Sequence, residues 1–278
     1  MALLQGSTQE ERRRLLNLFP VANLRLAFGD GSKEEICIRE AAGTGVQQLR
    51  KIGNFVSNNF CCCKQHIYVF EADTQFKLPN GFLGGVRVSQ TSSSAYYLAQ
   101  TSFTVTIFNQ PLSQQFVSIL WPLKIEIIGG YYLVRFAILE SDVAAVFGMN
   151  ARVTDRSLVE DDILTRVAQD LLAADLNKGV KHLWRTDFHE CPKGKFKKAD
   201  SLSSEQMDEK KGIKQNYPAI YQEMLLSPIH TSTFIIIDGS VKIDTYSVNP
   251  TFGTIGFSKY SQLGDTDAVI RQILDNNN

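Results

Sequence analysis

The chain has 278 residues, of which 44% are hydrophobic and 21% charged, so it can fold around a sizeable core. Its 29 basic and 29 acidic residues cancel, which argues against a chain that is basic overall, as dedicated nucleic-acid binders usually are. No apolar run is long enough to span a membrane, and the first residues lack the charge order of a secretory signal. We therefore expect a cytoplasmic protein that does not contact membranes.

The first half of the chain contains two helix starts and several short strands. Ser7 and Thr44 each open a capping-box pattern, because Glu10 and Gln47 follow three residues later. Strands are predicted where apolar residues form short runs or alternate with polar ones. These segments are 24–28, 36–38, 67–70, 96–108, 123–128 and 131–139, the last two forming a hairpin across Gly129-Gly130.

The second half begins with the clearest helical pattern. Ser157 can cap a helix whose apolar residues recur at helical spacing as far as Leu176, and Gly179 suits its carboxyl end. Ser203 is a weaker helix start of the same kind. Further helices are predicted at 218–226 and 266–274, and a hairpin at 233–237 and 241–246.

Strict alternation of strands and helices is absent, so a doubly wound parallel sheet is not expected. The element order predicts an α+β protein, with antiparallel sheet hairpins, flanking helices and a helical segment at about 155–226. We expect a β-rich domain over 1–150, and a second domain over 151–278 with the helical segment, a hairpin and the last helix. One continuous domain is the alternative.

Motifs for common enzyme classes are missing. The sequence has no P-loop, dinucleotide-binding, serine-hydrolase, zinc-protease or kinase pattern. We therefore expect a binding or accessory protein rather than an enzyme, and we predict no cofactor for it.

Two Cys–His pairs could supply metal ligands. Cys63 and His66 are three residues apart, and His189 and Cys191 are two apart. The pairs lie far from each other in the sequence and neither has zinc-finger spacing, so Zn²⁺ is disfavoured. Because the five cysteines show no disulfide pattern, we expect reduced thiols.

Strand-borne carboxylates offer a catalytic alternative. Asp238 precedes Lys242 and Asp244, which would share one face of a regular strand, and Lys124 and Glu126 repeat this spacing earlier. Carboxylates and a lysine on adjacent strands can hold Mg²⁺ and position a water for attack on a phosphodiester. The usual order is acid-x-Lys, and the order here is reversed. A turn and the solvent-facing side of a hairpin explain the same residues.

Positive charge is concentrated between residues 178 and 198, which we call the basic segment. Trp184, Phe188 and Phe196 are interleaved with its cations, and cations attract phosphates while aromatic faces stack on bases. The pattern predicts a contact with DNA or RNA. A solvated loop, or a helix packed on the core through Trp184 and Phe188, would look the same. The candidate contact residues are Lys178, Lys181, Trp184, Arg185, Lys193, Lys195, Lys197 and Lys198.

Three functions follow from these patterns. The leading hypothesis is a non-enzymatic accessory protein of a larger assembly that contacts nucleic acid through the basic segment. The second is a Mg²⁺-dependent nuclease or related hydrolase. The third is a purely protein-binding subunit whose basic segment meets an acidic protein partner.

Overall fold

The structure is a computed structural model that describes residues 57, 60, 64–73, 77–79, 85–186, 189–197, 203–207, 212–238, 241–258 and 265–278. The helices expected at Ser7 and Thr44 and the strands expected at 24–28 and 36–38 lie outside these residues. The chain forms two compact units, each assembled from separate stretches. Unit 1 includes Lys77–Glu126 and Phe136–Gln169, and unit 2 comprises Lys64–Phe76, Ile127–Arg135 and Asp170–Asn278. The expected division near residue 150 stays a prediction.

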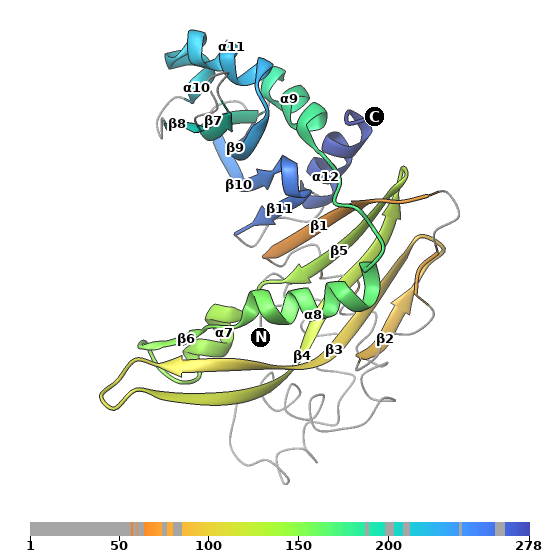
Figure 1. The fold of residues 1–278 in the computed structure, drawn as a ribbon, viewed down its shortest axis with the longest axis vertical. Coiled ribbons are helices and arrows are strands. Elements are labelled where there is room, and N and C mark those ends of the chain that lie inside the picture. Colours follow the sequence, from red (N-terminus) through yellow and green to blue (C-terminus); the bar gives the residue numbers. More distant parts are fainter. Residues whose placement is uncertain are drawn as a thin grey trace. The chain divides into compact units, whose positions relative to one another are not determined.

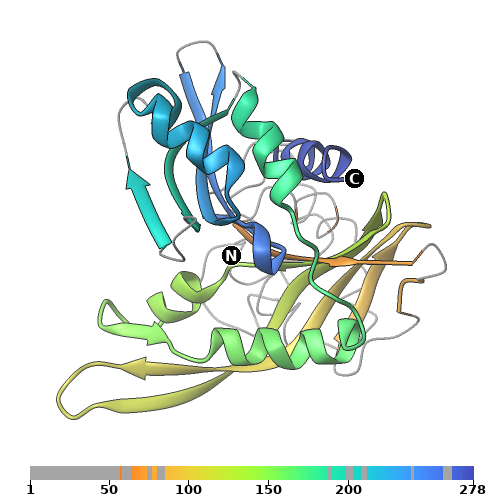
Figure 2. The same cartoon turned by 45° about the horizontal axis from the view of Figure 1, so that its top comes forward.

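Unit 1 is built on a long antiparallel hairpin, visible in Figures 1 and 2. Strand β3 (Ser94–Ile107) pairs antiparallel with β2 (Gly85–Gln90), β4 (Ser113–Ile128) and β6 (Ala151–Val153). The helices of this unit are α7 (Glu140–Ala145) and α8 (Arg156–Ala168). Trp121 is fully buried here between Phe103 and Phe136, and its indole N–H donates to the carbonyl of Ala137 over 2.6 Å.

Unit 2 contains a second set of strands, in the order β5-β1-β11-β10-β9-β7-β8. Every pair in it with a defined register is antiparallel. The strands are β1 (Gln65–Glu71), β5 (Tyr131–Ala137), β7 (His189–Lys197), β8 (Ser203–Met207), β9 (Ile229–Asp238), β10 (Val241–Asn249) and β11 (Thr254–Phe257).

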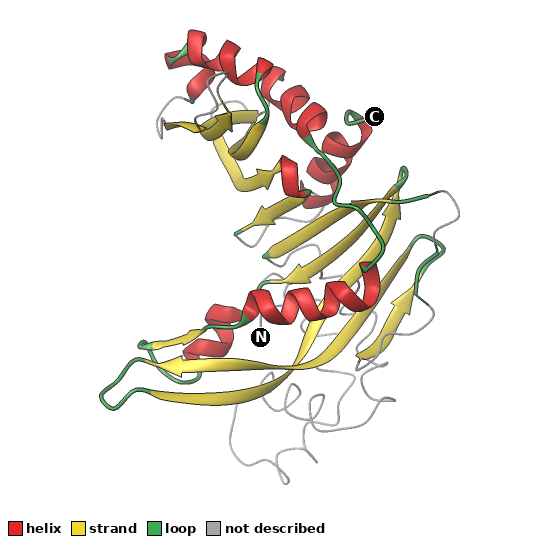
Figure 3. Cartoon of the chain, in the orientation of Figure 1, coloured by secondary structure: helices red, strands yellow, loops and turns green. Residues whose placement is uncertain are grey.

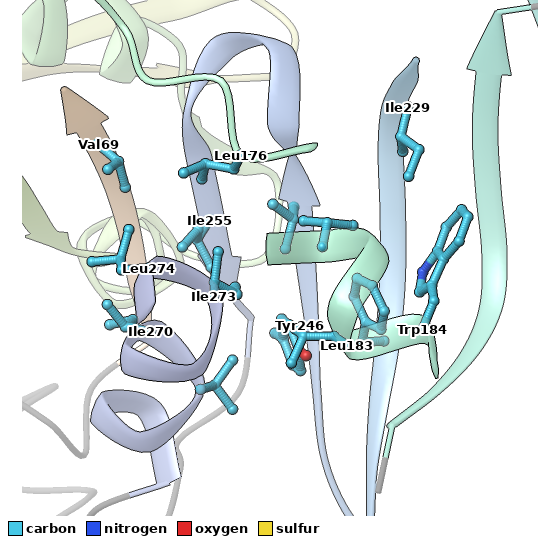
Figure 4. Packing of buried hydrophobic residues seen from close by; sticks show 14 of the residues in the cluster. Val69, Leu176, Leu183, Trp184, Ile229, Tyr246, Ile255, Ile270, Ile273 and Leu274 are labelled. Carbon is cyan, nitrogen blue, oxygen red and sulfur yellow. The ribbon is translucent and has the colours of Figure 1, made fainter. Parts of the chain in front are cut away.

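Helices contribute to one hydrophobic cluster with the buried side chains of these strands. Figure 4 shows Leu183 and Trp184 on one helix and Ile273 on another, close to Tyr246 and Ile255 of the strands. The helices of unit 2 are α9 (Asn177–Arg185), α10 (Ile213–Asn216), α11 (Pro218–Leu226) and α12 (Asp265–Asp275), with a short 3-10 turn, η2 (Pro250–Phe252).

The α+β class and the antiparallel pairing are therefore confirmed (Figure 3). The hairpin across Gly129-Gly130 is present, and both glycines have positive φ (56° and 89°), as a tight turn between two strands requires. The helices at 218–226 and 266–274 are also present. In the described part of the chain, no helix has the length and apolar character needed to cross a membrane.

The segment 155–226 differs from the sequence prediction. The prediction of one long helix from Ser157 to Gly179 was wrong, because α8 ends at Ala168 and α9 begins only at Asn177. The intervening chain pairs with β1 instead, where the Ala174 N–H donates to the carbonyl of Val69 over 2.9 Å. Two strands, β7 and β8, also interrupt the segment, so the helix start expected at 203 was wrong as well.

Candidate functional site

The basic segment is divided between a helix and a strand. On α9, Lys178 and Arg185 are exposed, whereas Lys181 is partly buried. Burial lowers the pKa of Lys181, an effect that nearby Asp175 partly offsets. Lys198 lies outside the described residues. The cations of α9 and those of β7 are therefore two separate groups.

Trp184 belongs to the core and not to the exposed surface. Its side chain is 2% exposed, and its ring centroid lies 6.2 Å from that of Tyr221 and 6.3 Å from that of Phe234. The Tyr221 hydroxyl donates to the backbone carbonyl of Trp184 over 2.8 Å, which ties α11 to α9. Because no ring face is accessible, Trp184 packs the helix onto the sheet and is not placed to stack on a base.

Strand β7 presents its lysines to one side. Lys193, Lys195 and Lys197 are exposed, whereas Gly194 and Phe196 between them are buried against the helices. Side chains alternate across a strand, so the three ammonium groups share one face at intervals of about 7 Å along the backbone. The opposite face of β7 packs against the hydrophobic core.

This exposed face continues across the sheet, because residues opposite one another in the strand register share a side. Neighbouring strands are about 4.8 Å apart, so a row over five strands is about 19 Å long. One such row consists of Lys193, Thr233, Ser247, Gly256 and His66. On the same side, Ile235, which lies opposite Glu190 and Thr245, is buried. We call the exposed and partly exposed part of this side the polar face; its members are Lys193, Lys195, Lys197, Thr231, Thr233, Ser247, Gly256, His66 and Tyr68.

At the β1 end of the polar face, His66 and Tyr68 lie side by side. Their ring centroids are 4.6 Å apart with an interplanar angle of 59°. Both side chains are partly exposed, whereas Ile67 and Val69, which point to the other side of β1, are completely buried. The polar face thus has cations at one end, two aromatic rings at the other, and hydroxyl groups and a glycine between them.

The structure does not bring the proposed metal ligands together. His66 is on the polar face, whereas His189 is buried among the aromatic side chains Phe234 and Tyr246 on the opposite side of the sheet. Burial raises the pKa of the Cys191 thiol to about 12, so it is a poor source of thiolate. Cys63 lies outside the described residues. Those residues contain no group of three or more His, Cys, Asp or Glu side chains able to hold a metal ion.

The carboxylate candidates fall in different units. Glu126, in unit 1, is 6% exposed, and its Oε2 lies 2.5 Å from Nζ of Lys124, so an ion pair occupies it. Asp238, Lys242 and Asp244 belong to unit 2, where the β9–β10 register shifts between Lys242 and Asp244. The regular alternation that would put these last two residues on one face does not hold across such a shift.

Of the polar-face residues outside β7, the sequence points only to His66, and to that as a metal ligand. The signal for β7 was present, since lysines at 193, 195 and 197 alternate with Gly194 and Phe196 with the period of a strand. Tyr68 and Ser247 carried no comparable signal, because only pairing between distant segments puts them on the surface that contains the lysines.

No protein-family model, no curated protein and no solved structure matches this chain.

Proposed function

We propose that the protein is a non-enzymatic nucleic-acid-binding protein, acting in the cytoplasm within a larger assembly, and that it binds through the polar face of unit 2. The observation that carries this proposal is the exposure of three lysines on one side of β7. Regularly spaced ammonium groups attract a phosphate backbone and release its counterions. The adjoining Thr and Ser hydroxyls can donate hydrogen bonds to phosphate oxygens.

The cations of α9 are the natural comparison. Lys178 and Arg185 are exposed, like the β7 lysines, but lie on a helix whose other side packs on the covered face of the sheet. Replacing them therefore tests whether any pair of surface cations is enough for nucleic-acid binding, or whether the cations must lie on the polar face.

The experiment compares two double charge reversals in the full chain. Lys193→Glu with Lys197→Glu should abolish salt-dependent binding of a labelled oligonucleotide in fluorescence anisotropy. Lys178→Glu with Arg185→Glu, the matched control, should retain most of the affinity. A wild type that binds neither DNA nor RNA at low salt overturns the proposal, as does equal loss in the two variants. If the wild type binds no nucleic acid but binds an acidic protein, and that binding needs Lys193 and Lys197, the protein-binding alternative is favoured.

A further inference from the structure

We propose that the ligand of the polar face is single-stranded nucleic acid, with phosphates at the β7 lysines and bases stacked at His66 and Tyr68. This inference rests on the proposed function and adds the class of nucleic acid and the residues that select it. Neither aromatic residue belongs to the basic segment, and both were brought to this surface by the pairing of β1 with β11.

The shape of the surface favours a single strand over a duplex. A duplex exposes base edges only inside its grooves, and reading them takes a protruding helix or ribbon. The residues in the middle of the polar-face row are small and belong to paired strands: Thr233, Ser247 and Gly256. A surface of this kind offers a duplex only phosphate contacts, whereas a single strand can also place its bases on aromatic rings.

His66 and Tyr68, at the β1 end of the polar face, can bind the bases of a single strand. Bases bind aromatic side chains through their π-faces without sequence preference. His66 and Tyr68 present two partly exposed rings from alternate positions of one strand, with centroids 4.6 Å apart. The tilt of 59° between the rings leaves them facing different directions, so they fit successive unstacked bases better than one extended stack.

The middle of the row carries only short side chains. Gly256 has none, and the Ser247 hydroxyl lies beside it, since a Cβ at Gly256 would come within 2.9 Å of Oγ of Ser247. Lys193 and His66 are the two ends of the row, about 19 Å apart. A strand that crosses from β7 to β1 thus meets cations first, then hydroxyl groups, then rings.

The test measures binding of the full chain to a labelled oligonucleotide of about twelve nucleotides, within the usual site size, and to its duplex. At equal salt, the single strand should bind at least about tenfold more tightly. Tyr68→Ala should weaken single-strand binding by about tenfold, the usual loss for one stacking residue. Because stacking is not ionic, the slope of affinity against salt should stay unchanged. Tyr68→Phe keeps the ring and should retain wild-type affinity.

Phe116 provides the matched control, since it is an aromatic residue of unit 1 with an exposed fraction of 81%. Phe116→Ala should leave binding unchanged. Equal affinity for single strand and duplex, or equal behaviour of Tyr68→Ala and Phe116→Ala, overturns the inference. The proposed function survives that result if Lys193→Glu with Lys197→Glu still abolishes binding, and both fail if it does not. Should Tyr68→Ala unfold the protein, Tyr68→Leu gives the same comparison with an apolar side chain of similar reach.

Discussion

Tyr246 donates a hydrogen bond to Nδ1 of His189 over 3.0 Å within the core of unit 2. The direction of this hydrogen bond follows from the other ring nitrogen, Nε2, which lies 3.0 Å from Oε1 of Gln272. Because that oxygen can only accept, Nε2 carries the proton and Nδ1 accepts from Tyr246. Burial lowers the pKa of His189, and the hydrogen bond to Gln272 only partly offsets this. The neutral imidazole therefore joins β7 to β10 and α12.

This arrangement makes the stability of unit 2 depend on pH. Unfolded histidine has a pKa of about 6.5, and the folded value of His189 is lower. Below pH of about 6.5 the unfolded chain binds more protons than the folded chain, so the free energy of unfolding should decrease as the pH is lowered. Above that pH, His189 should have no effect on the pH dependence. Urea unfolding followed between pH of about 7.5 and 5 measures the slope.

One variant tests whether His189 causes this pH dependence. His189→Gln should lose the part of the slope that comes from the buried imidazole, whatever its effect on stability at neutral pH. An unchanged slope in His189→Gln would show that another group controls the acid transition.

The lysines of the polar face should each contribute to the salt dependence of binding. Lys193, Lys195 and Lys197 are exposed on the same side of β7. Each ammonium group that neutralises a phosphate releases counterions. Replacing any one of the three lysines with Gln should therefore lower the slope of log affinity against log salt by about 0.7 for a single strand. Unchanged slopes in a salt titration of the three variants would contradict binding at this face.

Local signals explain the parts of the fold that could be predicted from the sequence. Gly129-Gly130 between two apolar strands marks a tight turn, and Pro218 at the first position of α11 marks a helix start. Neither signal needs information from elsewhere in the chain. The β-hairpin and the last two long helices were found for this reason.

Strand β7 carries conflicting local signals. Its lysines alternate with Gly194 and Phe196 as in a strand, but lysine and glycine are weak strand formers, and Pro192 lies within the segment. Pairing with β8 on one side and β9 on the other overrides these preferences. The helical spacing after Ser157 misled for the same reason, because Ala173 and Ala174 contact β1 instead of continuing the helix.

The candidate site was harder to predict from the sequence than the fold, because it depends on the register between strands that are distant in the sequence. The sequence predicts separate roles for Lys193 and His66, one as a phosphate contact and one as a metal ligand. Four successive strand pairings put them at opposite ends of one row. Trp184, the most prominent aromatic residue of the basic segment, faces the core because α9 is amphipathic.

A buried arginine should make Asp267 important for stability. Arg135 is 1% exposed, and its Nη1 lies 2.7 Å from Oδ1 of Asp267, while its Nε donates to Oε1 of Gln65 over 2.9 Å. Removing the carboxylate leaves a charged guanidinium in the interior with less compensation. Because the Asp267 side chain is itself 44% exposed, we expect Asp267→Asn to lower the free energy of unfolding by only about 1–3 kcal/mol.

The pair formed by Arg166 and Asp162 on α8 is the control for this change. Both of its side chains are exposed, and their separation of 2.5 Å is an i,i+4 contact on a helix surface. Asp162→Asn should therefore cost no more than about 0.5 kcal/mol in the same urea unfolding measurement. Similar losses in the two variants would mean that the buried position of Arg135 adds nothing.

The close contact between α9 and α12 should make Gly179 irreplaceable. A Cβ at this position would overlap the backbone carbonyl oxygen of Ile273, and the Gly179 N–H donates to Oδ1 of Asn277 over 3.0 Å. Alanine is favoured over glycine within a helix by about 1 kcal/mol, yet here the obstacle is backbone and cannot rotate away. We expect Gly179→Ala to lower the free energy of unfolding by about 1–3 kcal/mol. In Gly256→Ala, the added methyl group meets only the Ser247 hydroxyl, which can rotate, so the loss in urea unfolding should be distinctly smaller; equal losses would contradict the argument.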